Sequence, residues 1–133
     1  MDEVIVYITV QINPTESEGK VKSAVINLLD NASITITPFH KGITLNAKAK
    51  ERDSLVKFRG LLRNDRIRDA ARKALFHSIR GTSIVFCLNK QVAYAGHVSF
   101  SEETSESPLG PIKVTIETDN PKGLIEWLVE KSG

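Results

Sequence analysis

Hydrophobic and polar residues alternate along several short segments of the chain, a pattern that predicts β-strands with one buried face. In the first, from Val4 to Ile12, every second residue is Val or Ile, as a half-buried strand requires. Two further alternating runs, 33–39 and 43–50, are joined by a short segment that contains Pro38 and Gly42. They predict a hairpin with one solvated face.

The segment 86–114 predicts three more strands. An apolar run leads into a polar Asn-Lys-Gln turn, after which residues 92–100 show apolar side chains with a period of two. An acidic loop and a Pro-Leu-Gly-Pro corner separate this run from a last strand near 112–118. We therefore expect Lys90 and Gln91 at the tip of a hairpin.

Apolar residues spaced three and four apart predict helices in the remaining segments. Thr15 or Ser17 can cap the first helix, and Asn120-Pro121 is a favourable start for the last. Gly81 is expected just beyond the end of the third helix. The first expected helix follows its cap and closes at Asp30-Asn31, and the second lies near 52–63. The third runs from Asn64 or Asp65 to about Ile79, and the last follows Asn120-Pro121 to Val129.

The order of these elements predicts an α+β fold. Written along the chain it is β-α-β-β-α-β-β-β-α, where the middle α stands for one or two helices. Hairpin-joined strands favour a mostly antiparallel sheet with helices packed on one face. The chain has 133 residues, of which 41% are hydrophobic and 26% charged. This length and composition fit a single α+β domain over residues 1–133.

Cysteine usage and the N-terminal segment predict a cytoplasmic protein. Cys87 is the only cysteine, which excludes an intramolecular disulfide framework and indicates a reducing compartment. The apolar run 4–12 is too short to span a bilayer and follows no basic segment, so we expect no membrane association. The three histidines lack the ligand spacing of a zinc site. We expect a non-enzymatic protein without a metal or a small-molecule cofactor, because no acid, base and nucleophile converge in the pattern.

The charge of the chain is small but unevenly distributed. The net charge is +2, yet eight basic residues and two acids lie between Lys57 and Arg80, a local charge of +6. Such a surface can attract a polyanion to one side of the molecule. A solvated pair of helices whose charges serve only solubility explains the same pattern, and both interpretations stay open at this point.

Under the first interpretation, guanidinium groups of the basic helix bridge phosphates of a nucleic-acid backbone. A lysine and a glutamine at a hairpin tip can contact a phosphate or a base edge. The candidate nucleic-acid-binding residues are Arg63, Arg66, Arg72, Lys73, Arg80, Lys90 and Gln91.

Two apolar residues on the outward side of the first strand suggest a second interpretation. Ile5 and Tyr7 alternate with the core-facing valines and form an apolar pair that a partner can cover. Symmetric pairing is the commonest way to cover such a patch, so we expect a homodimer. The alternative function is therefore a dimeric protein-interaction or structural module without nucleic-acid binding.

Three segments together resemble a known protein family. They are Ile67 to Arg72, Leu88 to Gly96, and Glu106 to Ile112. In this order and spacing they resemble the archaeal uncharacterised protein family 0201, and the resemblance covers nearly the whole chain. It implies a fold like that of ribosomal protein L-five and a role in binding structured RNA or a ribonucleoprotein. It implies no catalytic residues.

Overall fold

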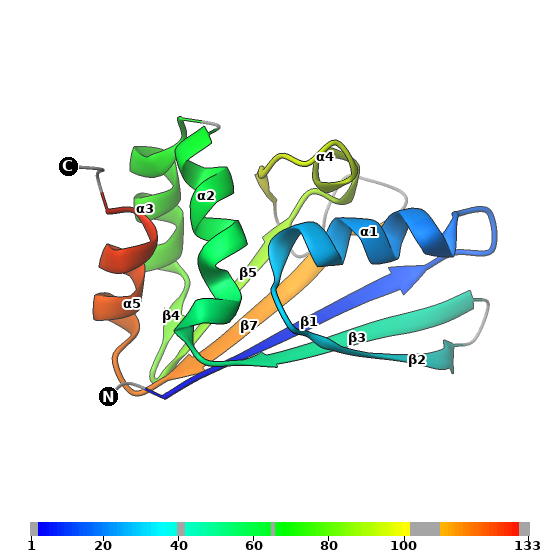
Figure 1. Ribbon diagram of the computed structural model, residues 1–133, viewed down its shortest axis with the longest axis horizontal. Helices are drawn as coiled ribbons and strands as arrows, with labels where there is room; N and C mark the ends of the chain where they lie inside the picture. Colours follow the sequence, from blue (N-terminus) through cyan, green and yellow to red (C-terminus); the bar gives the residue numbers. More distant parts are fainter. Residues whose placement is uncertain (1–2, 40–41, 65, 102–109, 131–133) are drawn as a thin grey trace.

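The computed structural model describes residues 3–39, 42–64, 66–101 and 110–130, and it is built on one antiparallel sheet (Figure 1). The strand order is β2-β3-β1-β7-β5-β4, and the short strand β6 also pairs with β5. Every described pairing is antiparallel. The strands are β1 (Val4–Ile12), β2 (Ser33–Phe39), β3 (Gly42–Lys50), β4 (Ile79–Arg80), β5 (Ser83–Leu88), β6 (Phe100–Ser101) and β7 (Ile112–Thr118).

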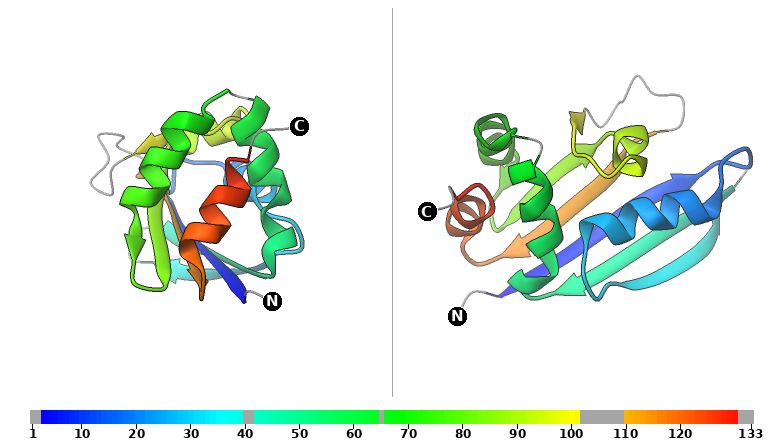
Figure 2. Two further views of the ribbon diagram at one scale, coloured as in Figure 1. Left: turned by 90° about the vertical axis from the view of Figure 1, so that its left-hand side faces the viewer. Right: turned by 45° about the horizontal axis from the view of Figure 1, so that its top comes forward.

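The described helices all lie on one side of this sheet (Figures 1 and 2). This arrangement confirms the predicted α+β class with helices on one face. The helices are α1 (Glu18–Leu28), α2 (Val56–Asn64), α3 (Arg68–His77), α4 (Lys90–Tyr94) and α5 (Pro121–Leu128), and a 3₁₀ turn, η1 (Arg52–Leu55), precedes α2.

β1 forms the middle of the sheet and follows the predicted alternation. It pairs with β3 on one side and β7 on the other, and its Val and Ile residues at even positions from 4 to 12 are all buried. Each such side chain contributes about 1.5–3 kcal/mol when it leaves water. The buried hydrophobic residues of the sheet and helices form one continuous core.

α1 begins and ends as predicted. The Ser17 hydroxyl accepts a hydrogen bond from the Lys20 backbone N–H at 3.3 Å, which caps the first turn. The apolar side chains of α1 form one stripe, and Val21, Ala24 and Val25 within it are wholly buried. None of the described helices has the length and apolar character needed to cross a membrane.

The strand predicted over residues 92–100 is wrong, and a short helix replaces its first half. The Asn89 side chain accepts a hydrogen bond from the Val92 backbone N–H at 3.0 Å and caps α4. Only β6 returns to pair with β5. Asparagine suits both a tight turn and a helix cap, so the local sequence did not separate the two structures. The acidic loop and the first two residues of the Pro-Leu-Gly-Pro corner lie outside the described residues.

The third predicted helix is shorter than expected at both ends. Arg66 has φ of +55°, and α3 starts only at Arg68. At the other end, α3 stops at His77 and the chain enters the hairpin of β4 and β5. Gly81, with φ of +64°, lies in the turn of that hairpin. Its predicted place after a helix is wrong, because a left-handed glycine serves a hairpin turn as well as a helix end.

Candidate nucleic-acid interface

α3 and its two flanks carry exposed basic side chains, as the sequence predicted. Arg66, Arg72, Lys73 and Arg80 are all exposed. Among the described residues, the side chains of Arg66 and Lys73 make no hydrogen bond or ion pair. Arg80 donates to the carbonyl oxygens of His77 and Ile79, both at 2.9 Å. A cation at this position complements the negative end of the α3 dipole.

Arg72 is shared between this surface and the neighbouring helix α5. Its guanidinium pairs with the carboxylate of Glu126 and lies over the Phe76 ring, 4.9 Å from the centroid. Both charged side chains are about half exposed, and an exposed pair of this kind contributes about 1 kcal/mol at most. Arg72 can therefore exchange Glu126 for another anion at a small energetic cost.

Arg63, by contrast, is turned toward the C-terminal end of α5. Its guanidinium donates to the Glu130 carbonyl oxygen at 3.5 Å, and Arg68 reaches the same oxygen at 3.5 Å. Arg59 donates to the Trp127 carbonyl at 2.9 Å. Carbonyl groups at a helix end have no partner inside the helix, and cations near them are favourable. These three arginines therefore fix α5 against α2 and α3.

Lys90 is not at a hairpin tip but in the interior. Its side chain is fully buried, and Nζ donates to the Gln11 carbonyl at 2.7 Å and to both carboxylate oxygens of Glu16 at 3.1 and 3.2 Å. The Tyr94 hydroxyl donates to Glu16 Oε2 at 2.8 Å. The network joins the end of β1, the segment before α1, and α4. Lys90 is thus committed to interior contacts.

The surroundings of Glu16 favour its charged form. Burial alone would raise the pKa of Glu16, but hydrogen bonds from Asn13, Tyr94 and Lys90, together with the charge of Lys90, lower that pKa below its ordinary value. The pKa of Tyr94 is raised well above its ordinary value, first by burial and then by the hydrogen bond to the Glu16 carboxylate. The three side chains form an ion pair with a neutral phenol beside it.

Gln91 is exposed on α4, which packs against α1 rather than against α3. Figure 1 and the right-hand view of Figure 2 show α4 apart from α3. Arg72 and Lys73 therefore lie on α3, Arg66 just before it and Arg80 in β4 just after it. Gln91 lies on a different helix.

The side of the sheet opposite the helices is a second polar surface, of which the sequence interpretation included only Ile5 and Tyr7, as a patch for a dimer partner. We call it the open sheet face and define it as the outward residues of β3, β1 and β7. It carries three lysines and one acid among Thr, Asn and Gln side chains, with Tyr7 in the middle strand. The sequence signal for this face is the same two-residue period that predicted the buried residues of the strands. Its charged and large members are Ile5, Tyr7, Lys48, Lys50, Lys113 and Glu117.

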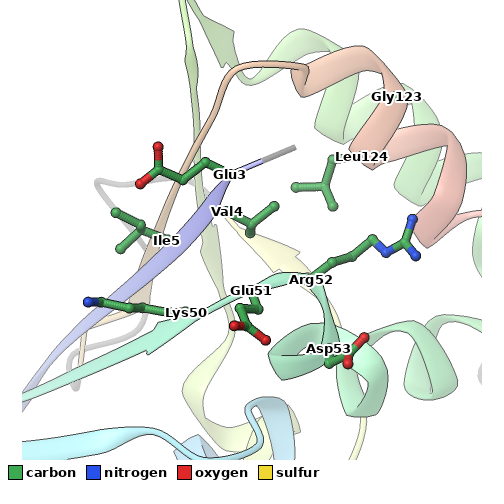
Figure 3. A pocket seen from close by; sticks show the side chains of 9 residues that line it. All are labelled: Glu3, Val4, Ile5, Lys50, Glu51, Arg52, Asp53, Gly123 and Leu124. Carbon is green, nitrogen blue, oxygen red and sulfur yellow. The ribbon is translucent and has the colours of Figure 1, made fainter. Parts of the chain in front are cut away.

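A pocket of about 620 Å³ lies at the end of the sheet, between the start of β1, η1 and the first turn of α5 (Figure 3). Glu51, which lines it, has φ of +72°, a conformation that L residues rarely adopt. Its charged side chains have both signs: Glu3, Glu51 and Asp53 against Lys50 and Arg52. In the part of the chain that the structure describes, no three His, Cys, Asp or Glu side chains are placed to hold a metal ion.

Comparison with known proteins identifies the family of this chain. A family model described as RNA binding matches residues 5–118. A UPF0201 protein of Sulfurisphaera tokodaii is 44% identical over 127 residues, which cover 96% of this chain and 88% of the relative. The chain belongs to the UPF0201 family. A UPF0201 protein of Sulfolobus acidocaldarius is 42% identical over the same shares of the two chains.

A solved UPF0201 structure has the same fold. The crystal structure of the UPF0201 protein from Methanococcus jannaschii superposes with a TM-score of 0.82 at 32% identity, covering 94% of this chain and 98% of that one. The family resemblance found in the sequence is confirmed, as is the α+β architecture. The expected likeness to ribosomal protein L-five stays a prediction.

Proposed function

We propose that this UPF0201 chain is a non-enzymatic protein that binds structured RNA through the exposed basic side of α3. The observation that carries the proposal is the group formed by Arg66, Lys73 and Arg80, with Arg72 beside them. We call these four residues the α3 basic surface. The description of the matching family model as RNA binding supports the same class of ligand.

The α3 basic surface has the length that a nucleic-acid backbone requires. α3 contains ten residues, and a helix of that length rises about 15 Å. The basic side chains begin in the turn before α3 and continue to β4 after it, so they can contact more than one phosphate. Such contacts fix a protein on the backbone without reading sequence. Double-stranded RNA is recognised mostly by shape and by its phosphates and 2′-hydroxyls, so paired RNA is the expected ligand.

Three of the seven residues expected to bind nucleic acid have no direct role in this proposal. The ammonium group of Lys90 is buried and bonded to Glu16 and Gln11. The guanidinium of Arg63 contacts the end of α5, and Gln91 lies on a separate helix. Arg63 contributes only indirectly, because it links α2 to the end of α5.

A salt titration of RNA binding tests the proposal. Wild type and an Arg66→Glu, Lys73→Glu variant are titrated with a short fully paired RNA duplex at several salt concentrations. The matched control is Lys20→Glu, Lys22→Glu, which changes the net charge equally at exposed positions of α1. We expect the α3 variant to bind more weakly and its log–log salt slope to fall by roughly one unit per lost contact.

Two results would contradict the proposal. The first is wild type that fails to bind the duplex below about 100 μM in low salt, where even non-specific contacts register. The second is equal loss of affinity in the α3 variant and the α1 control, which would make net charge, and not the α3 basic surface, responsible.

A further inference from the structure

We propose that the open sheet face binds an unpaired stretch of RNA, with the Tyr7 ring as a stacking platform for one base. The inference rests on the proposed RNA-binding function and adds a second contact surface of different chemistry. It concerns the side of the sheet that no described helix covers (Figures 1 and 2).

Tyr7 lies at the centre of a row of side chains that crosses three strands. In the β-sheet register it is opposite Lys48 of β3 and Thr115 of β7. The Lys48 Nζ lies 5.6 Å from the centroid of the Tyr7 ring, and the ring is half-buried. Neighbouring strands are about 4.8 Å apart, so these side chains can contact a single nucleotide together.

The neighbouring rows supply the remaining groups that an unpaired strand requires. Ile5 is opposite Lys50 and Glu117, and Thr9 is opposite Asn46 and Lys113. The hydroxyl of Thr9 donates to Asn46 Oδ1 at 3.2 Å. Sequence-tolerant binding of single strands combines cationic groups that follow the backbone with an aromatic ring on which a base stacks.

Charge favours RNA over a second copy of this chain on the open sheet face. The face carries three lysines and one acid. A symmetric face-to-face dimer would bring the six lysines of the two copies together with only two acids of the same strands. Charged residues are depleted at the cores of protein interfaces, and like charges placed against each other are costly. A polyanion meets Lys48 and Lys50 of β3 favourably.

The Tyr7 ring at the centre of the open sheet face fits an unpaired stretch of RNA and not an RNA duplex. The bases of an RNA duplex are stacked on one another, and only the backbone and groove edges are accessible. The Tyr7 ring can stack only on a base that is free of its neighbours. The open sheet face and the α3 basic surface therefore suit the unpaired and the paired parts of a structured RNA respectively.

The test compares Tyr7 variants on two RNA probes by fluorescence anisotropy. The probes are a labelled oligouridine, which is single-stranded, and the labelled RNA duplex. We expect Tyr7→Thr, which keeps a β-branched residue in the strand, to lose about fivefold or more in oligouridine affinity, the lower range for losing one base stack. Tyr7→Phe keeps the ring and should bind oligouridine like wild type.

Lys48→Gln provides a second variant at an exposed position of β3. It should lower oligouridine affinity and reduce the salt slope by about 0.7, the value for one phosphate contact on a single strand. Circular dichroism of each variant establishes that it is folded. The Arg66→Glu, Lys73→Glu variant should show the opposite selectivity, with the larger loss on the duplex.

Three results would overturn the inference, and they are distinguishable. Duplex binding that depends on α3, with oligouridine affinity unchanged in folded Tyr7→Thr and Lys48→Gln, removes the open sheet face and leaves the proposed function. Failure of wild type to bind either probe removes both. Light scattering that shows twice the chain mass for wild type and the single-chain mass for Tyr7→Thr assigns the face to a second copy.

Discussion

The ammonium group of Lys90 is fully buried, and hydrogen bonds to the Glu16 carboxylate and the Gln11 carbonyl replace those it would make with water. A buried charge is costly unless it is paired and hydrogen-bonded. Nζ donates to the Gln11 carbonyl and to both carboxylate oxygens of Glu16, and Glu16 accepts further hydrogen bonds from Asn13 and Tyr94. Removing either charge leaves the other buried without its partner.

We expect Glu16→Gln to lower the free energy of unfolding at neutral pH by about 3 kcal/mol, because it breaks the buried ion pair of Glu16 and Lys90. Urea denaturation measures the effect. Glu117→Gln, which removes an exposed carboxylate on β7, is the control and should change stability little. The double variant Glu16→Gln, Lys90→Met should lose less than the sum of the two single variants. Strict additivity would contradict the ion pair.

The ion pair of Glu16 and Lys90 also predicts how the stability of the protein changes with pH. The folded pKa of Glu16 is below its ordinary value of 4.5, so the charged carboxylate stabilises the protein above that pH. This contribution is lost as the pH falls through the folded pKa. Wild type and Glu16→Gln should therefore converge in stability as the pH falls below about 4.5. A constant difference down to pH 3 would show that Glu16 acts through packing alone.

The sequence could not reveal this pair because its members are 74 residues apart and each looks like a surface residue. What the sequence did predict at this scale is local: the alternating core residues of β1 and the Ser17 cap. The exposure of Arg66, Lys73 and Arg80 was also predictable, since their spacing keeps them off the buried stripe of α3.

Among the elements, α4 is the one whose type the sequence misjudged. The apolar residues over 92–100 do recur with a period of two, but the segment is not a strand. The buried Ala93 belongs to α4, and the buried Val98 lies in an irregular segment after it. β1, α1 and the hairpin of β2 and β3 were predicted because their patterns are long. α4 has only five residues, too few for periodicity to separate a helix from a strand.

The Asn89 cap gives a test of this element. We expect Asn89→Ala to cost about 1 kcal/mol of stability, because the Val92 N–H loses its acceptor. Asn89→Ser keeps a capping oxygen and should remain close to wild type. Thermal or urea unfolding compares the three proteins. Equal loss in both variants would mean that asparagine is needed for a turn conformation and not for the cap.

For the molecule as a whole, the fold places positive charge on two separate surfaces. On the helical side, acids of α5 engage part of the basic segment, since Glu126 pairs with Arg72 and Glu130 with Arg59. Arg66, Lys73 and Arg80 remain exposed beyond them. On the opposite side, the lysines of β3 and β7 flank Tyr7. The uneven charge was readable from the sequence, whereas its division between two faces required the register of the sheet.

Crosslinking in cells that produce the protein tests the central claim most directly. Ultraviolet irradiation joins bound RNA to the residues that contact it, and the crosslinked RNA and peptides are then identified together. We predict crosslinked RNA with paired segments, on peptides that contain Arg66 to Arg80. Recovery of no RNA above the background of an unirradiated sample, or crosslinks confined to peptides of α1, would contradict RNA binding through the α3 basic surface.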